Sequence, residues 1–172
     1  MNQVYSTNNL TYATVDLGYN STKIAIIEDG NIMVSRIVDM GMKHIDQNIL
    51  NFCDYSIREL EERKAEIGNI NCMESEDSDY EILLKLIKNS LEDLNDKIEM
   101  IFRYYLTREI GNEIHGILLY GGGSQIVGIS DFFTNYFNIP SVIIQSFDNI
   151  EFHGEIYKYI NSIGAIIRSI EV

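Results

Sequence analysis

One short segment combines a carboxylate, a glycine turn and donor side chains. This segment, DLGYNSTK, begins at Asp16, and that carboxylate can hold Mg²⁺ directly or through water because hard cations take oxygen ligands. Gly18 allows backbone N–H groups to approach an anion closely. Ser21 and Thr22 add hydroxyl donors, and Lys23 adds a positive charge. The segment predicts a cradle for phosphate and magnesium, while an ordinary hairpin turn is the plainer interpretation of the glycine.

A run of glycines forms the second candidate site. Three glycines in a row clear space for a flat or bulky ligand, and a helix that starts after them offers unpaired N–H donors. A flexible strand-to-helix turn would explain the same pattern. The residues of this run are Gly121, Gly122, Gly123 and Ser124.

An acid–base pair forms the third candidate site. Glu61 and Lys64 are three residues apart and therefore share one face of a helix. Taken alone, such a pair predicts a solvated ion pair. Its proximity to the other two motifs in a folded chain would make it a candidate for ligand binding.

Three strands must position the first motif. Segments rich in β-branched and aromatic residues predict strands at 12–17, 23–28 and 32–39. Asp29-Gly30, between the last two, is a strong hairpin signal. Three antiparallel strands are therefore expected to open the domain.

Helices must position the acid–base pair. Apolar spacing predicts a helix from Ile45 to about residue 54. Ser56, with Glu59 three residues later, predicts a capped helix that ends at Gly68. A long helix is expected from about 80 to 106, because its apolar residues recur three and four apart.

The last third of the chain alternates strands and helices. We expect a buried strand at 116–120, a helix at 126–137, a strand at 141–145 and a closing helix at about 154–169. A hairpin-rich start followed by this alternation predicts an α/β fold. The expected architecture is a mixed five-stranded sheet flanked by helices.

Composition limits the partners of the chain. The 172 residues fit one domain, and a formal charge of −13 argues against binding to nucleic acid or to an anionic membrane surface. No apolar run approaches the roughly 20 residues needed to cross a bilayer, and the first residues lack a signal-peptide pattern. Cys53 and Cys72 match no zinc spacing and are interpreted as reduced thiols. We therefore expect a cytoplasmic protein without direct membrane insertion.

The order of these motifs resembles the actin superfamily, whose fold is RNase H-like. DLGYNSTK is similar to its second phosphate motif, YGGGSQIVGI (120–129) to its adenosine motif, and INSIGAIIRS (160–169) to its closing helix. Within the superfamily the sequence resembles the PilM family, the FtsA-like proteins of type IV pilus assembly. IEDGNIMVSRIVDMG (27–41) and SIRELEERKAEIG (56–68) carry that resemblance, which extends over about 12–172.

The resemblance implies ATP and Mg²⁺ as ligands of the complete protein. The first motif would face the phosphates and magnesium, with Asp16 as the metal ligand. Glu61 and Lys64 would touch the ribose or the adenine, and the glycine run would pass behind the adenosine. Three positions depart from the family pattern. Leu60 stands in place of an alanine, Met42 stands in place of the second glycine of a pair, and Lys23 is more like the first phosphate motif of the superfamily than the second.

Proteins of this superfamily resemble two related halves that close on a nucleotide. The chain has one set of three opening strands, so we expect the C-terminal half and no complete ATPase site, because a single half leaves a triphosphate largely in water. The expected organisation is a disordered lead-in at 1–10, an actin-like core at 11–43 and 107–172, and an inserted, mainly helical subdomain at 44–106.

The implied function is that of a scaffold. A PilM-like platform protein would couple its nucleotide state to pilus assembly at the inner face of the membrane. Its partners would be a PilN-like membrane protein bound through the missing half, the assembly ATPase and other copies of itself. Three alternatives stay open: a cell-division or filament-forming actin relative, a sugar kinase on the same fold, and a protein-binding module that has lost nucleotide.

Overall fold

The computed structural model describes residues 10–72, 78–147 and 150–170, and five strands form one sheet in the order β3-β2-β1-β4-β5. The predicted mixed five-stranded sheet is confirmed. Except for residue 10, the predicted lead-in at 1–10 lies outside the described residues. The strands are β1 (Thr11–Leu17), β2 (Thr22–Glu28), β3 (Asn31–Val38), β4 (Gly116–Tyr120) and β5 (Ser141–Ile143).

The sheet combines two pairing modes. β2 runs antiparallel to both β1 and β3, whereas β4 runs parallel to β1 and to β5. Asp29 and Gly30 join β2 to β3 with φ values of 46° and 78°. Both values lie in the left-handed region that a two-residue hairpin turn requires, so the hairpin prediction is confirmed.

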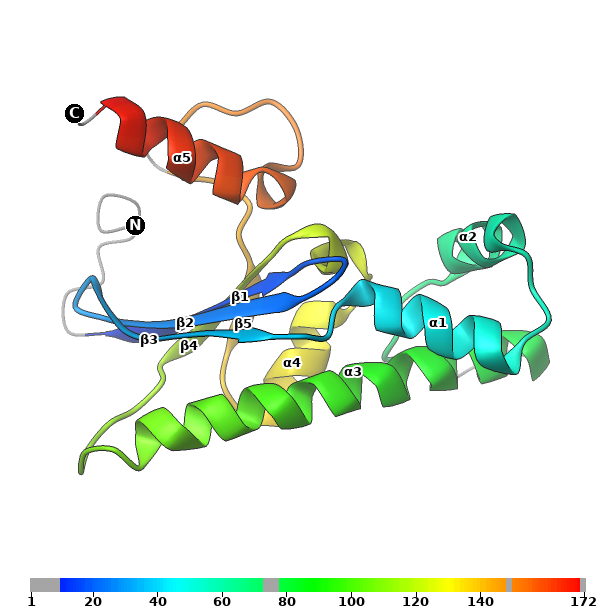
Figure 1. Cartoon of the computed structure of the whole chain (residues 1–172), viewed down its shortest axis with the longest axis horizontal. Coiled ribbons are helices and arrows are strands. Elements are labelled where there is room, and N and C mark those ends of the chain that lie inside the picture. Colours follow the sequence, from blue (N-terminus) through cyan, green and yellow to red (C-terminus); the bar gives the residue numbers. More distant parts are fainter. Residues whose placement is uncertain (1–9, 73–77, 148–149, 171–172) are drawn as a thin grey trace.

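Helices cover both faces of the sheet. In Figure 1, α3 and α4 lie on one face and α5 lies on the other, while α3 continues past the sheet alongside α1 and α2. Two short 3-10 turns, η1 (Gly122–Gln125) and η2 (Ile156–Lys158), precede α4 and α5. The helices are α1 (Met42–Phe52), α2 (Ile57–Glu66), α3 (Ser78–Leu106), α4 (Ile129–Phe137) and α5 (Ile160–Ile170).

Two hydrophobic cores hold these layers together. The main core joins the sheet to α1–α4 and includes the fully buried Val15, Ile98 and Phe133. A smaller core on the opposite face packs Leu118 and Tyr120 against η2 and the start of α5. β4 has a core on each face, which explains its uninterrupted apolar sequence GILLY. Helices α1–α3 share the main core with the sheet. The division into a core at 11–43 and 107–172 and an inserted subdomain at 44–106 stays a prediction.

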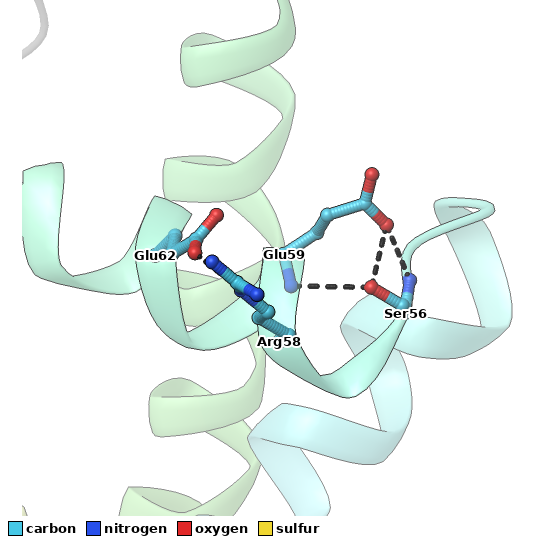
Figure 2. A network of polar contacts seen from close by, with 4 residues as sticks. All are labelled: Ser56, Arg58, Glu59 and Glu62. Carbon is cyan, nitrogen blue, oxygen red and sulfur yellow. Dashed lines mark hydrogen bonds and ion pairs between the residues drawn. The ribbon is translucent and has the colours of Figure 1, made fainter.

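Helix α2 begins with the predicted capping box (Figure 2). The hydroxyl of Ser56 accepts the backbone N–H of Glu59 at 3.3 Å, and the Glu59 carboxylate accepts the backbone N–H of Ser56 at 2.8 Å. The hydrogen bonds that the carboxylate accepts from the backbone N–H and the hydroxyl of Ser56 hold the pKa of Glu59 below its ordinary value. Arg58 pairs with Glu62 one turn further along the helix. Each contact uses a short sequence spacing, so the cap could be predicted locally.

The end of α2 differs from the prediction. The helix stops at Glu66, and Ile67 already has extended backbone, with φ −70° and ψ 120°. Ile67 packs against the main core and Ile70 is fully buried in it, so core packing turns the chain out of the helix before Gly68. Gly68 therefore does not cap the helix.

The closing helix also starts later than predicted. The backbone at Gly154 has φ +128°, and η2 intervenes before α5 begins at Ile160. This arrangement brings Ile156 and Ile160 onto the smaller core. The first turn of α5 is thereby fixed close to the end of β1.

Candidate functional site

Two backbone segments meet at the end of β1. The carbonyl of Gly18 accepts the N–H of Met42 at 3.0 Å, and the carbonyl of Tyr19 accepts the N–H of Lys43 at 2.9 Å. The first turn of α1 thus satisfies two of its free N–H groups on the turn that follows β1. The predicted phosphate turn is held in place by α1.

Glycines allow these segments to approach closely. Gly121 has φ +88°, and a β-carbon there would stand 2.5 Å from Oδ1 of Asp16. A β-carbon on Gly123 would stand 2.8 Å from that of Leu17. A β-carbon on Gly122, in contrast, would meet nothing within 4 Å. Gly121 and Gly123 are therefore needed for packing, whereas Gly122 faces open space.

Asp16 carries the buried carboxylate of the first motif. The residue is 4% exposed, and its Oδ2 accepts hydrogen bonds from Lys23 Nζ at 3.3 Å and Asn161 Nδ2 at 2.9 Å. Tyr120 lies beside Asp16 on the neighbouring strand. Burial, together with the charge of Asp16, raises the pKa of Tyr120 to about 12. Tyr120 is therefore a neutral neighbour of the carboxylate at physiological pH.

A pocket of about 570 Å³ lies between α1, α2 and the glycine run. Apolar side chains such as Met42, Ile45 and Ile126 form its sides. Of the predicted site residues, it brings together Glu61, Lys64, Gly122 and Gly123. The other predicted residues do not line it, and they are Asp16, Gly18, Ser21, Thr22, Lys23, Gly121 and Ser124.

The polar edge of this pocket is an ion-pair network. Lys64 Nζ lies 2.7 Å from Oδ1 of Asp46 and 3.2 Å from Oε1 of Glu61. Burial alone would lower the pKa of Lys64, but the hydrogen bonds and charges of Asp46 and Glu61 outweigh it and raise the pKa above 10.5. The ammonium is therefore charged and held by two carboxylates, of which Asp46 is the more buried and Glu61 is exposed.

The hydroxyl groups of the two motifs have different environments. Thr22 is fully buried, and its Oγ1 donates to the carbonyl of Met40 at 2.8 Å, which ties the start of β2 to the chain after β3. Ser21 is partly exposed. The hydroxyl of Ser124 is buried and has no hydrogen-bond partner among the described residues.

Sequence reasoning missed three residues of this region. Asp46 lies next to Ile45 on the buried side of α1, and a carboxylate at such a position was a usable signal. Tyr19 lines the pocket from the turn after β1. Asn161 reaches Asp16 across 145 residues of sequence, and no local pattern indicates that contact.

Leu60, which departs from the family pattern, does not crowd the pocket. Its side chain is 1% exposed within the main core and is not among the lining residues. Met42, the second departure, lines the pocket, and its sulfur would lie 2.7 Å from a β-carbon on Gly123. The bulk at residue 60 therefore serves packing.

The donor set fits a magnesium ion that arrives with phosphates. Mg²⁺ is usually held by one or two carboxylates plus substrate phosphates and water, and Asp16 supplies one carboxylate. Across the described part of the chain, no group of three or more His, Cys, Asp or Glu residues could hold a metal ion by itself. Within the same residues, no helix is long and apolar enough to cross a membrane.

Comparison with known proteins gives both sequence and structural matches. Residues 4–161 match the family described as type IV pilus assembly protein PilM. No curated protein matches the sequence. A structure of the PilM-PilN type IV pilus biogenesis complex superimposes with a TM-score of 0.71 at 18% identity, over 97% of this chain and 48% of that one.

Two further solved structures extend the comparison. MreB 5 of Spiroplasma citri bound to AMPPNP has a TM-score of 0.71 at 19% identity, over 95% of this chain and 54% of that one. An archaeal actin homolog has a TM-score of 0.61 at 16% identity, over 96% of this chain and 50% of that one. These likenesses confirm the predicted actin-like fold. The chain spans about half the length of the structures it matches.

Proposed function

The chain belongs to the PilM family of type IV pilus assembly proteins, and on that premise we propose that it forms the C-terminal half of an actin-like, nucleotide-binding platform protein. The observation that carries the proposal is the pocket beside the glycine run, lined by Glu61, Lys64, Gly122 and Gly123. In the complete protein this half would face a second half across the nucleotide. The platform would work in the cytoplasm, at the inner face of the cell membrane.

The lining of the pocket suits a nucleoside. Apolar walls with a few polar groups are typical of small-molecule sites, and here Ile45 and Ile126 offer apolar surface for a planar base. Glu61, Lys64 and Gln125 offer hydrogen-bonding groups for the base or the ribose. A solved relative, MreB 5 of Spiroplasma citri, is bound to AMPPNP, which supports a nucleotide as the ligand.

The turn after β1 would serve the phosphates. Asp16 would hold the magnesium ion that a nucleotide carries, and Lys23 and Ser21 would donate to the phosphates. Magnesium neutralises charge on phosphate oxygens and orients them. Because phosphoryl transfer depends on groups placed around the whole phosphate chain, one half would bind nucleotide without hydrolysing it efficiently.

The partners would be other pilus assembly proteins. A solved relative forms a PilM-PilN complex, and we propose that a PilN-like membrane protein binds the half that lies outside this chain. The assembly ATPase and further copies of the platform protein would complete the contacts. The formal charge of −13 supports protein partners over nucleic acid or anionic lipid.

A second candidate function is a protein-binding module that has lost nucleotide. The observation that favours it is the ion-pair network at the edge of the pocket. Lys64 is already held by Asp46 and Glu61, so the chain satisfies this polar edge without a ligand. Binding measurements separate the two functions.

Calorimetric titration of the 172-residue chain with Mg·ATP tests the proposal. Gly122→Leu would fill the pocket without a clash at the backbone, because a β-carbon there meets nothing within 4 Å. We expect it to weaken binding by about tenfold or more, which corresponds to about 1.4 kcal/mol. Gly164→Ala is the matched control, because its β-carbon also meets open space, but in α5.

The outcomes divide clearly. Binding that Gly122→Leu weakens and Gly164→Ala leaves unchanged supports a nucleotide site. Loss of the magnesium dependence in Asp16→Ala supports the assignment of the metal ligand. If neither Gly122→Leu nor Asp16→Ala changes the binding of Mg·ATP, or if the chain does not bind Mg·ATP, the protein-binding module is favoured.

A further inference from the structure

We propose that Asn161 is a positioning residue for Asp16, and that their hydrogen bond links the seating of α5 to the occupancy of the Asp16 carboxylate. The first half of this inference concerns the chain alone. The second half rests on the proposed nucleotide function. The two halves are tested separately below.

The contact joins distant parts of the chain, from a donor on an exposed residue of α5 to a buried carboxylate. Asn161 lies in the first turn of α5 and donates from Nδ2 to Oδ2 of Asp16 at 2.9 Å. Asp16 is 4% exposed, so few waters can replace this donor. Hydrogen bonds to an ionised carboxylate are stronger than those between neutral groups. The side chain of Asn161 therefore restricts where the carboxylate can point.

Over residues 160–166 of α5, whose side chains the structure describes, the apolar packing against the smaller core comes from the first turn. Ile160 is buried and Ile163 packs against the smaller core. Further along, a β-carbon on Gly164 would meet nothing within 4 Å, and Ile166 is 60% exposed. The hydrogen bond of Asn161 therefore adds a polar attachment to the apolar packing of Ile160 and Ile163 in the seating of α5.

A second link runs beside the first. The carbonyl of Tyr157, in η2, accepts the N–H of Gly121 at 2.9 Å. Gly121 is the residue whose β-carbon would stand 2.5 Å from Oδ1 of Asp16. The segment that leads into α5 is thus bonded to the glycine run, and the first turn of α5 is bonded to the phosphate motif.

Competition at one oxygen provides the coupling. Oδ2 of Asp16 accepts hydrogen bonds from both Lys23 and Asn161. A cation that uses this carboxylate as a ligand changes the hydrogen bonds that Asn161 and Lys23 make with it. Because coupling between two sites is reciprocal, any effect of the ligand on the seating of α5 requires an equal effect of that seating on ligand affinity.

Hydrogen exchange, measured by mass spectrometry on peptides covering 156–166, tests the positioning role without nucleotide. We expect Asn161→Ala to accelerate exchange there by roughly tenfold, the effect of losing one hydrogen bond to a charged group. Ser162→Ala is the matched control, because it makes the same kind of polar-to-alanine change on an exposed neighbour. Equal exchange in the two variants would overturn the proposal.

A double-mutant comparison separates the specific contact from general damage. Asp16→Ala should accelerate exchange in 156–166 as Asn161→Ala does, and the double variant should add little, because both substitutions remove the same bond. If Asp16→Ala does not fold, Asp16→Asn replaces it in this comparison, because asparagine keeps an acceptor oxygen at this position. Fully additive effects would show that Asn161 does not act through Asp16.

The coupling is tested at saturating Mg·ATP, with binding followed independently by calorimetry. Binding together with changed exchange in 156–166, and an affinity altered by Asn161→Ala but not by Ser162→Ala, supports the coupling. Binding with unchanged exchange and unchanged affinity overturns the coupling and leaves the proposed function standing. Absence of binding overturns the proposed function and the coupling together, while the comparison without nucleotide still decides the positioning role.

Discussion

The carbonyl oxygen of Gly18 lies 2.5 Å from the place where a β-carbon on Gly41 would stand, and the same oxygen accepts the N–H of Met42 at 3.0 Å. The turn after β1 and the start of α1 are therefore in direct backbone contact. This contact leaves no room for a side chain at residue 41. It also fixes the first motif relative to the pocket that α1 lines.

Gly41→Ala should destabilise the fold. Its β-carbon would also stand 2.5 Å from the carbonyl oxygen of Tyr19, so the backbone must shift. Overpacking of this kind costs about 1–3 kcal/mol in the free energy of unfolding, which urea denaturation measures. Gly122→Ala, with no neighbour within 4 Å, should change it by about 0.5 kcal/mol or less. Equal stability of the two variants would contradict the close contact.

Asp46→Ala should destabilise the pocket edge, because Lys64 would lose its partner at 2.7 Å. A hydrogen bond to a charged group contributes about 1.5–3 kcal/mol, and chemical denaturation should show a loss of that size. Adding Lys64→Met should recover part of the loss, since it removes the ammonium left without this carboxylate. No recovery in the double variant would mean that Asp46 acts independently of Lys64.

The same network predicts a dependence on alkaline pH. The pKa of Lys64 is raised above the value of 10.5 expected in the unfolded chain, so its protonated form favours the folded state. The contribution is fully present below pH 10.5 and is lost as the pH rises through the raised pKa. The stability difference between the wild type and Lys64→Met should therefore shrink above pH 10.5. A difference that stays constant from pH 8 to 11.5 would show that the charge of Lys64 does not matter.

Ser56→Ala should weaken α2 at its start. Loss of the N-cap hydroxyl costs about 1 kcal/mol in the free energy of unfolding. Arg58→Ala is a control from the same turn, because its exposed pair with Glu62 contributes about 0.5 kcal/mol or less (Figure 2). Urea denaturation should rank the two variants in that order. The reverse order would mean that the cap does not stabilise the helix.

Asn95→Leu should raise the melting temperature. Asn95 is fully buried in α3, and neither polar atom of its amide has a hydrogen-bond partner among the described residues. A buried polar group without a partner costs about 1–3 kcal/mol, and leucine has a similar shape without that cost. Asn95→Ala measures the cavity effect separately. If Asn95→Leu lowers the melting temperature as much as Asn95→Ala, the amide has a stabilising partner.

The elements predicted well from sequence are those with local signals. Asp29-Gly30 indicated a tight turn from two adjacent residues. The cap formed by Ser56 and Glu59 lies within one helical turn, so its two residues are close in sequence. The end of α2 could not be predicted from Gly68, because the burial of Ile67 and Ile70 in the core decides where the helix stops. Local chemistry predicts the turn after β2 and the start of α2, whereas core packing decides the end of α2 and accompanies the late start of α5.

The candidate site divides in the same way. Family motifs predicted that Glu61 and Lys64 lie near Gly122 and Gly123, and all four line one pocket. The position of Asp46 on the buried side of α1 was a usable signal, but sequence could not identify Lys64 as its partner, because that contact joins two helices. It also could not distinguish the packed glycines from Gly122, since that difference depends on how closely other backbone segments approach.

The pairing of β1 with β4 has a consequence for synthesis on the ribosome. Thr11 donates its N–H to His115, 104 residues later in the chain, and β1 pairs with β4 beyond that contact. At roughly 5–20 residues per second, β1 waits on the order of 5–20 s for its partner strand. Throughout that time its unpaired edge can template pairing with another nascent chain. The junction of Asp16 with Gly121 and Asn161 is completed only after that wait, so the corner that we propose for the phosphates is among the last parts of the fold to form.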